Sequence, residues 1–345
     1  MPDPKRILIV RLSHLGDVVH ALPVYHVLAA GFPDAELGWA VQPEYADLVA
    51  GLPRISRVIR FGRKERLKAW SKLRREFRTW RPDWTIDCQG NVKSGFVTRF
   101  SGAERRTGLA KQDWREPFGA RFINDQAPPA YGKHAIHRML MLAGHAARGP
   151  EPRFDLPLSD AELDGGRALL AQHLPPGAGP LRILHPGVAG DPRSWPEASY
   201  ATLASRLSRA GERVLIITGP DEGEVGARIA AALSSEEDIR HWIAQRGLRD
   251  LAAVFRAAAE MGGRLAAGDS GPMHIAAAVQ LGVDLIAGPQ DPSLTGPWPL
   301  PKNPDSIHRV HRAEGDAPAT SDLAPETVAD ALLAQANPDL IRTDP

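Results

Sequence analysis

Short apolar runs alternate with amphipathic stretches along the whole chain. In the first half, the apolar runs predict strands at residues 6–10, 36–41, 57–61 and 84–88, and the amphipathic stretches predict helices at 17–30, 66–80, 91–100 and 134–147. The second half predicts strands at 182–185, 213–218, 264–267 and 284–287, and helices at 197–209, 222–233, 248–259 and 272–279. Such alternation is typical of parallel α/β architecture.

Proline is concentrated between the two halves, with six prolines between residues 149 and 180 around one predicted helix at 159–173. Because proline at this density interrupts regular structure, we expect an interdomain connection there. The sequence predicts two Rossmann-like, doubly wound domains, 1–155 and 156–322, facing a central cleft. We expect the last helix, at 325–335 within residues 323–345, to pack back on the first domain. Ligands of open α/β sheets bind at the carboxyl ends of strands, so the loops there are the candidate sites.

Bulk composition narrows the class of protein only slightly. A chain of 345 residues is long enough for two domains. Its only cysteine, Cys88, excludes an internal disulfide and a metal cluster of thiolates. No run approaches the ~20 apolar residues of a membrane span, and the apolar run at 7–10 is too short for a signal peptide. These features favour a cytoplasmic location.

Basic residues are concentrated in one segment of a chain whose net charge is only +1. Apolar residues within 66–80 have helical spacing, which predicts either an ordinary amphipathic helix or a contact with anionic substrates or membrane head groups. Nucleic acid is not favoured, because no recognised nucleic-acid module is present. The twelve basic residues, opposed only by Glu65 and Glu76, are Arg54, Arg57, Arg60, Arg63, Lys64, Arg66, Lys68, Lys72, Arg74, Arg75, Arg78 and Arg81.

The loop after the first strand lacks the common nucleotide-binding motifs. It reads Arg11-Leu12-Ser13-His14-Leu15-Gly16-Asp17, with neither a Gly-x-Gly-x-x-Gly turn nor a P-loop lysine. The chain also has no His-Glu-x-x-His motif and no Gly-x-Ser-x-Gly elbow. This argues against nicotinamide dehydrogenases, P-loop enzymes and serine hydrolases, and we expect no metal site.

Asp17 opens the helix that follows this loop. It can be read as an acid that caps the helix or favours its first turn. It can also be read as a general base at the mouth of the cleft, placed to take a proton from an acceptor hydroxyl. The residues alone leave both interpretations open.

Three further strand-end loops carry candidate ligand contacts. Asp269, Ser270 and Gly271 precede Pro272, which suits a first helical turn, so they predict a helix N-terminus that could bind a diphosphate. Arg193, in a glycine-rich loop, could bind phosphate or lie in solvent. Glu222 could hold ribose hydroxyls or simply favour the N-terminus of its helix.

Several blocks, in order along the chain, resemble glycosyltransferase family 9. Residues 13–23, Ser-His-Leu-Gly-Asp-Val-Val-His-Ala-Leu-Pro, are similar to its N-terminal signature. Residues 86–94 (Ile-Asp-Cys-Gln-Gly-Asn-Val-Lys-Ser), 114–117 (Trp-Arg-Glu-Pro) and 134–135 (His-Ala) resemble the heptosyltransferase I subgroup. Residues 268–278 and 288–292 resemble the nucleotide-sugar block of the family.

The resemblance implies a GT-B fold and an inverting transferase that moves heptose from ADP-heptose to the Kdo-containing inner core of lipopolysaccharide. It implies no required cofactor and a peripheral position on the cytoplasmic face of the inner membrane. Asp17 would be the general base. The resemblance implies donor contacts by Arg193, Glu222, Asp269, Ser270, Gly271 and His274, and acceptor contacts by Ser13, His14, Gly16, Arg60, Arg63, Lys64 and Lys93.

The chain departs from the subgroup after the strand at 182–185, where Gly187 and Val188 replace hydroxyl-bearing residues, so phosphate contacts there must come from backbone N–H groups. Alternatives are heptosyltransferase II, a family 9 transferase with another donor, a sugar-nucleotide epimerase, and an inactive nucleotide-sugar-binding homologue. Asp17 favours the enzymes, because an inactive homologue would have no reason to keep a carboxylate there.

Overall fold

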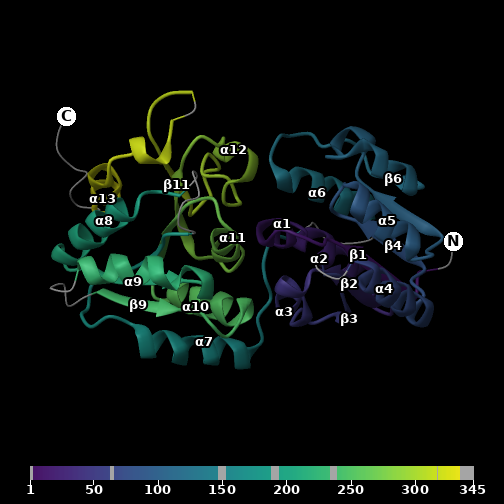
Figure 1. The fold of residues 1–345 in the computed structure, drawn as a ribbon, viewed down its shortest axis with the longest axis horizontal. Coiled ribbons are helices and arrows are strands. Elements are labelled where there is room, and N and C mark those ends of the chain that lie inside the picture. Colours follow the sequence, from purple (N-terminus) through teal and green to yellow (C-terminus); the bar gives the residue numbers. More distant parts are fainter. Residues whose placement is uncertain are drawn as a thin grey trace. The chain divides into compact units, whose positions relative to one another are not determined.

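The chain forms two compact units, Met1–Leu158 and Ser159–Pro345. The boundary between them in the sequence is three residues after the predicted one, which followed residue 155. The computed structural model describes residues 3–62, 66–146, 153–187, 194–233, 239–316 and 318–334. In Figure 1 the colours of the first unit run from purple to blue, and those of the second run from teal to yellow.

The first unit is built on a six-stranded sheet in the order β3-β2-β1-β4-β5-β6, in which every pairing is parallel. Its strands are β1 (Arg6–Val10), β2 (Glu36–Val41), β3 (Ile55–Arg60), β4 (Trp84–Asp87), β5 (Arg105–Gly108) and β6 (Asp125–Gln126). Its helices are α1 (Leu15–His20), α2 (Leu22–Gly31), α3 (Ala46–Ala50), α4 (Arg66–Trp80), α5 (Val92–Phe100) and α6 (Ala135–Ala146), with 3₁₀ turns η1 (Pro43–Tyr45), η2 (Lys111–Asp113) and η3 (Pro117–Phe122).

The second unit repeats this plan with a parallel sheet in the order β12-β11-β10-β7-β8-β9. Its strands are β7 (Leu181–His185), β8 (Arg213–Thr218), β9 (Ile239–Ile243), β10 (Arg264–Ala267), β11 (Gly282–Ala287) and β12 (Arg309–Arg312). Its helices are α7 (Asp160–His173), α8 (Glu197–Arg209), α9 (Gly223–Ala232), α10 (Leu248–Glu260), α11 (Gly271–Ala278), α12 (Pro292–Thr295) and α13 (Pro325–Leu333), with η4 (Pro220–Glu222) and η5 (Thr320–Asp322). Two doubly wound domains, as predicted, are therefore confirmed.

The basic helix α4 is amphipathic, as its spacing predicted. Leu73, Phe77 and Trp80 are buried in one hydrophobic cluster with residues of β1, β2 and β3. The exposed side chains include Arg74 and Arg78. Since its apolar face is already used by the core, α4 cannot bind a membrane through that face.

The C-terminal helix α13, which we expected to pack back on the first domain, packs its apolar face within the second unit. Val328, Ala329 and Leu332 are buried in one cluster with residues of α8, β7 and β8. The carbonyl of Leu332 also accepts a hydrogen bond from the buried Arg182 of β7, at 3.2 Å. The apolar face of α13 is thus satisfied within its own unit.

Two features of the chain were missed from the sequence. The single helix expected at 17–30 is broken at Ala21 into α1 and α2, because Pro23 starts a new helix in its first turn. The strands β5, β6, β9 and β12 were not predicted. Their sequences, such as Arg-Arg-Thr-Gly in β5 and Arg-Val-His-Arg in β12, carry too much charge to be recognised as buried strands.

None of the helices among the described residues has the length and hydropathy that a membrane-spanning segment needs.

Candidate functional site

In the first unit, the loops after β1 and β4 are joined at the carboxyl edge of the sheet. These strands are neighbours, and the chain continues from them toward opposite sides, which makes this edge the switch point of the sheet. The guanidinium of Arg11 donates to the carbonyl of Cys88. The N–H of Leu12 donates to Oε1 of Gln89 at 2.7 Å, and Nε2 of Gln89 donates to Oγ of Ser13 at 3.1 Å.

A buried carboxylate fixes the turn after β4. Asp87 is fully buried and accepts the N–H groups of Gln89 and Gly90, at 2.9 Å and 3.0 Å. Burial raises the pKa of Asp87, and these backbone hydrogen bonds oppose that rise. The turn holds the amide of Gln89 where it reaches the loop after β1.

Asp17 lies in the first turn of α1, at the same edge. Its Oδ2 lies 2.5 Å from Nη2 of Arg11 and 3.6 Å from Nδ1 of His14. Burial raises the pKa of Asp17, but the charges of Arg11 and His20 and the hydrogen bond from His14 lower it further, so the pKa lies well below its ordinary value. The result is an ionised carboxylate whose side chain is still 35% exposed.

The N-cap of α1 is His14, so Asp17 does not cap the helix, although it is an acid of the first turn. His14 has a positive φ of 38° and a side chain that is 65% exposed. Ser13 is buried, and Gly16 lies in the first turn of α1. One short loop thus brings the predicted residues Ser13, His14 and Gly16 together with Asp17.

The basic residues predicted at the acceptor site are more widely spaced. Arg60 is exposed at the end of β3, which is two strands from β1. Lys93 lies in the first turn of α5, and its Nζ lies 4.8 Å from the ring centroid of Phe61, the residue after Arg60. Arg63 and Lys64 lie outside the described residues.

In the second unit, the corresponding switch point lies between β7 and β10. Ser270 is the N-cap of α11, and Pro272 lies in the first turn, as predicted. The Oγ of Ser270 makes no hydrogen bond to any described residue, so Ser270 holds the N-cap position without capping the helix through its side chain. The first N–H groups of α11 therefore have no side-chain cap and point beyond the sheet edge.

Asp269 is held from two elements at this edge. Its Oδ2 accepts a hydrogen bond from Oγ1 of Thr295, at the end of α12, at 2.6 Å. Its Oδ1 lies 3.3 Å from Nε2 of His274, which is buried in α11. The predicted residues Asp269, Ser270, Gly271 and His274 are thus brought together, with the carboxylate of Asp269 in a fixed orientation.

Glu222 is the last residue of η4, the turn that follows β8, and β8 is the strand next to β7. Its Oε2 accepts the N–H of Gly219 at 2.9 Å and lies 3.9 Å from Nδ1 of His185, the last residue of β7. Its side chain is 15% exposed. Glu222 therefore stabilises its own loop while it lies near the switch point. Arg193 lies outside the described residues.

Arg11, Gln89 and Thr295 also belong to these sites and were not predicted from the sequence. Gln89 lies inside a block that resembled the family, and Arg11 is the first residue after β1, so the position of each was a usable signal. Thr295 gave none, because its contact with Asp269 joins residues 26 positions apart.

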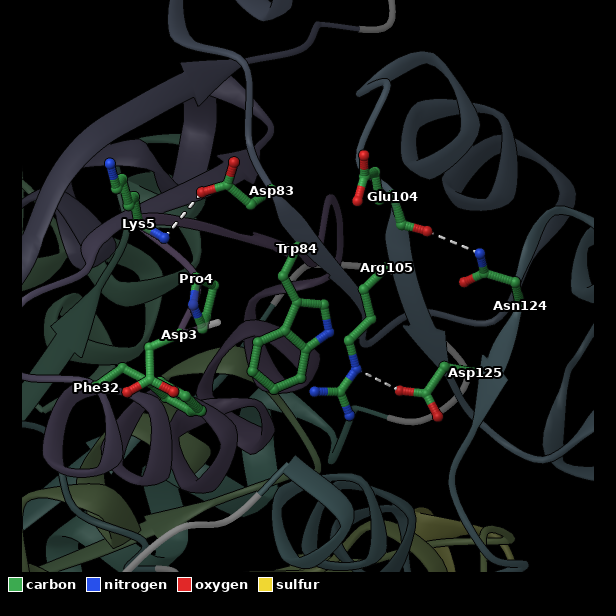
Figure 2. A pocket seen from close by; sticks show the side chains of 10 residues that line it. All are labelled: Asp3, Pro4, Lys5, Phe32, Asp83, Trp84, Glu104, Arg105, Asn124 and Asp125. Atoms are coloured by element: carbon green, nitrogen blue, oxygen red, sulfur yellow. Dashed lines mark hydrogen bonds and ion pairs between the residues drawn. The ribbon is translucent and has the colours of Figure 1, made fainter. Parts of the chain in front are cut away.

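A separate hollow of about 860 Å³ opens at the opposite, amino-terminal edge of the first sheet. Figure 2 shows the indole of Trp84 in its middle, and the guanidinium of Arg105 lies 4.0 Å from the ring centroid. Arg105 is paired with Asp125 at 2.7 Å, and Asp83 accepts the N–H of Lys5 at 2.8 Å. Arg105 and Asp125 thus pair with each other, and the hollow lies away from the strand ends where such sheets bind ligands.

Within the part of the chain that the structure describes, no three His, Cys, Asp or Glu side chains are grouped so that they could hold a metal ion.

Comparisons with known proteins agree with the resemblance seen in the sequence. A sequence profile of glycosyltransferase family 9 (heptosyltransferase) matches residues 70–316. The lipopolysaccharide heptosyltransferase 1 of Pseudomonas aeruginosa is 33% identical over 303 residues, which cover 85% of this chain and 81% of that protein. The lipopolysaccharide heptosyltransferase 2 of Escherichia coli is 26% identical, with 95% of this chain and 98% of that protein covered.

Solved structures lead to the same family. The Escherichia coli heptosyltransferase WaaC with ADP has a TM-score of 0.74 and 25% identity, covering 96% of this chain and 99% of that one. The same enzyme with ADP-2-deoxy-2-fluoro heptose gives a TM-score of 0.72, also at 25% identity. The predicted GT-B fold is confirmed.

Proposed function

The chain belongs to glycosyltransferase family 9, the heptosyltransferase family, and from this premise we propose that it transfers heptose from ADP-heptose to the inner core of lipopolysaccharide. The donor is supported by the similar WaaC structures, which contain ADP and an ADP-heptose analogue. We favour the Kdo-containing core as acceptor, because identity is 33% to a heptosyltransferase 1 and 26% to a heptosyltransferase 2.

The observation that carries the chemistry is the ionised carboxylate of Asp17 at the switch point of the first sheet, 2.5 Å from Arg11. In the proposed step, an acceptor hydroxyl oxygen forms a bond to C1 of heptose while the bond from C1 to the ADP oxygen breaks. ADP leaves with the bonding electrons, and the proton passes from the hydroxyl to Asp17. Attack opposite the leaving group inverts the configuration at C1.

A carboxylate of low pKa suits this step if the proton moves late. As the new C–O bond forms, the acceptor hydroxyl becomes strongly acidic, so even a weak base can take its proton. Besides its hydrogen bond to the carbonyl of Cys88, Arg11 then keeps Asp17 ionised, so that Asp17 can accept the proton at every pH where the protein works.

We propose that the second unit binds the donor. The N–H groups at the start of α11, with the positive end of its dipole, would bind the diphosphate, and Arg193 would add a charge. Asp269, fixed by Thr295 and His274, would bind hydroxyls of the sugar. Glu222 would bind the ribose. The N–H groups of α11 and the charge of Arg193 would stabilise the negative charge that develops on the leaving ADP, and we propose that no cofactor is required.

The acceptor would bind to the first unit. Its phosphates and the carboxylates of Kdo are anionic, and the exposed Arg60 and the adjacent Lys93 offer positive charge at the same sheet edge as Asp17. Arg63 and Lys64 follow Arg60 in the chain and would extend this cationic surface.

A donor and acceptor screen tests the function. The purified chain is given ADP-heptose, GDP-sugars or UDP-sugars, with either a deacylated Kdo-containing core or the same core already carrying one heptose. We expect one heptose to be added, only from ADP-heptose and only to the core without heptose. Transfer only to the heptosylated core would assign the chain to the heptosyltransferase II type, and donor binding without any transfer would indicate an inactive homologue.

A further inference from the structure

The side-chain amide of Gln89 bridges the two loops at the carboxyl edge of the first sheet. Its Oε1 accepts the N–H of Leu12 at 2.7 Å, and its Nε2 donates to Oγ of Ser13 at 3.1 Å. Leu12 and Ser13 follow β1 and Gln89 follows β4, so the amide joins residues 77 and 76 positions apart. The bridge therefore holds the loop that leads to Asp17.

The turn that carries Gln89 is itself fixed. The buried carboxylate of Asp87 accepts the N–H groups of Gln89 and Gly90, and its Oδ2 accepts a hydrogen bond from Oγ1 of Thr98, in α5, at 3.3 Å. Gly90 has a positive φ of 72°, a conformation that glycine adopts readily, and a Cβ there would lie 3.0 Å from the side chain of Leu109. The turn is thus held from several sides, and so is the start of the side chain of Gln89.

The N–H of Leu12 settles which way the amide of Gln89 is turned. A backbone N–H can only donate, so the amide atom 2.7 Å from it must be the oxygen. The other amide atom is then the nitrogen, which can only donate, and Oγ of Ser13 must accept from it. The direction of the hydrogen bond between Gln89 and Ser13 follows from these two contacts.

This direction leaves Ser13 with a hydrogen to donate. Because a lone pair of Oγ is directed at Gln89, the O–H bond of Ser13 points elsewhere, and Oγ donates to no other residue that the structure describes. Ser13 is only 5% exposed, so water has little access to it. A buried hydroxyl without a partner costs free energy, and a polar atom of a bound ligand would remove that cost.

We propose that Gln89 is a positioning residue, which presents the hydroxyl of Ser13 as a hydrogen-bond donor to the acceptor sugar beside Asp17. This inference rests on the proposed function. The ionised carboxylate of Asp17 can only accept hydrogen bonds, whereas Ser13, oriented by Gln89, donates one. Together they recognise a sugar that offers a hydroxyl hydrogen to Asp17 and, next to it, an oxygen lone pair to Ser13.

The oxygen that Ser13 binds is not the one that reacts. A hydrogen bond donated to the reacting hydroxyl oxygen would draw away the electron pair that attacks C1 of heptose. A bond to a neighbouring oxygen leaves that pair available and is equally strong before and during the reaction. Its loss therefore raises the KM for the acceptor and leaves kcat unchanged, whereas a disturbed loop would displace Asp17 and lower kcat.

A double-mutant cycle of Gln89→Glu and Ser13→Ala tests the proposal. Transfer is measured at saturating ADP-heptose while the concentration of a deacylated Kdo-containing core is varied. A carboxylate at position 89 still accepts the N–H of Leu12 but cannot donate, so the hydroxyl of Ser13 would turn and donate to it. We expect Ser13→Ala to raise the acceptor KM about fivefold, the effect of one hydrogen bond, with kcat unchanged.

The cycle separates the hydroxyl from the added charge, which would also repel an anionic acceptor. In the original chain, Gln89→Glu should raise the acceptor KM at least about fivefold. In the Ser13→Ala background the same substitution should have an effect about fivefold smaller, because the hydroxyl that it turns is absent. The matched control is Gln126→Glu, which adds the same charge at an exposed residue of the edge strand β6 and should leave KM unchanged.

Equal effects of Gln89→Glu in the two backgrounds would overturn the proposal, because Gln89 would then act without the hydroxyl of Ser13. So would a fall in kcat without a change in KM, because Gln89 would then serve Asp17 instead. If the original chain transfers no heptose, the proposed function fails. Calorimetric binding of the core to the same four proteins then decides this inference through the cycle in Kd, and equal effects or no binding would count against it.

Discussion

Nη2 of Arg11 lies 2.5 Å from Oδ2 of Asp17, at the carboxyl edge of the first sheet. The side chain of Arg11 is 10% exposed, whereas that of Asp17 is 35% exposed. A buried cation thus supports a carboxylate that a substrate can reach. This relationship explains how Asp17 remains ionised although its burial favours the neutral form, and it makes the base hypothesis testable through its neighbour.

Replacing Arg11 by Met should raise the pKa of Asp17, because burial then acts without the opposing charge. The pKa of Asp17 in the original chain lies below its ordinary value of 3.8, so this carboxyl stays ionised at ordinary assay pH. In Arg11→Met the acid limb of the kcat profile should move to higher pH, and activity should fall as the pH is lowered through it. Arg11→Lys keeps the charge and should restore most of the original profile. An unchanged acid limb in Arg11→Met would remove Arg11 from this role.

Asp17→Asn should abolish transfer, because the amide cannot accept the proton of the acceptor hydroxyl. Loss of a general base typically lowers kcat by about 10²–10⁴-fold. Affinity for ADP-heptose, measured by calorimetry, should stay within a few-fold, since we propose that the donor binds to the second unit. The thermal midpoint serves as the control, because the variant leaves the buried Arg11 without its carboxylate. Turnover close to that of the original chain would show that another group takes the proton.

The strands and helices that the sequence predicts well are those with a long, uninterrupted hydrophobic pattern. The predicted ranges of β1, β2, β8, β10, α4 and α8 coincide with the observed ones. By contrast, β5 carries Arg105 and Arg106, and these are accommodated by Trp84, Asp125 and backbone carbonyls. Trp84, Asp125 and the carbonyl of Phe122 lie 16 or more residues away, so no local pattern reports them.

The candidate site follows the same rule. Asp17 and Asp269 were predictable because strand-end loops meet at the switch points of doubly wound sheets. The residues that orient them were not, since Thr295 reaches Asp269 from a different element, and the ion pair of Arg11 depends on where α1 begins. Sequence patterns show which loops lie at the edge of the sheet, whereas the side chains that pair across that edge can be identified only from the structure.

Asp269→Asn should weaken donor binding, because the amide loses the charge that would hold sugar hydroxyls. Thr295→Val removes only the hydrogen bond to Oδ2 of Asp269, so it should have a smaller effect, of about 1 kcal/mol or roughly fivefold in Kd. Calorimetry with ADP-heptose and with ADP alone distinguishes contacts with the sugar from contacts with the nucleotide. Both variants should bind ADP as the original chain does, and an equal loss for ADP would mean that Asp269 contacts the nucleotide instead.

Asp125 makes stability depend on pH in the acid range. It accepts hydrogen bonds from Arg105 at 2.7 Å and Thr107 at 2.6 Å, and it pairs with His145 at 2.7 Å. Burial raises its pKa, but these partners lower it further, to about 2, against an ordinary value of 3.8. Since the folded pKa is the lower one, this stabilisation is present above about pH 4 and is lost as the pH falls toward 2.

Asp125→Asn should therefore lower the free energy of unfolding by about 2 kcal/mol at pH 7, and by progressively less as the pH falls below 4. Urea unfolding followed between pH 2 and 7 gives this difference directly. Glu104→Gln, at an exposed residue of the same hollow (Figure 2), is the matched control and should change stability by less than about 0.5 kcal/mol. A loss that is constant over this pH range would mean that packing, and not the charge of Asp125, supplies the stabilisation.

Two adjacent glycines of α7 should respond to alanine in opposite directions. A Cβ at Gly166 would lie 2.5 Å from backbone atoms of Ala253 in α10, so the two helices would have to separate, whereas a Cβ at Gly165 meets nothing within 4 Å. Gly166→Ala should destabilise the chain by about 1–3 kcal/mol through overpacking. Gly165→Ala should stabilise it by about 0.5–1 kcal/mol, because alanine favours the helix. Urea unfolding of both variants measures the difference, and similar values for the two would show that α7 does not approach α10 through Gly166.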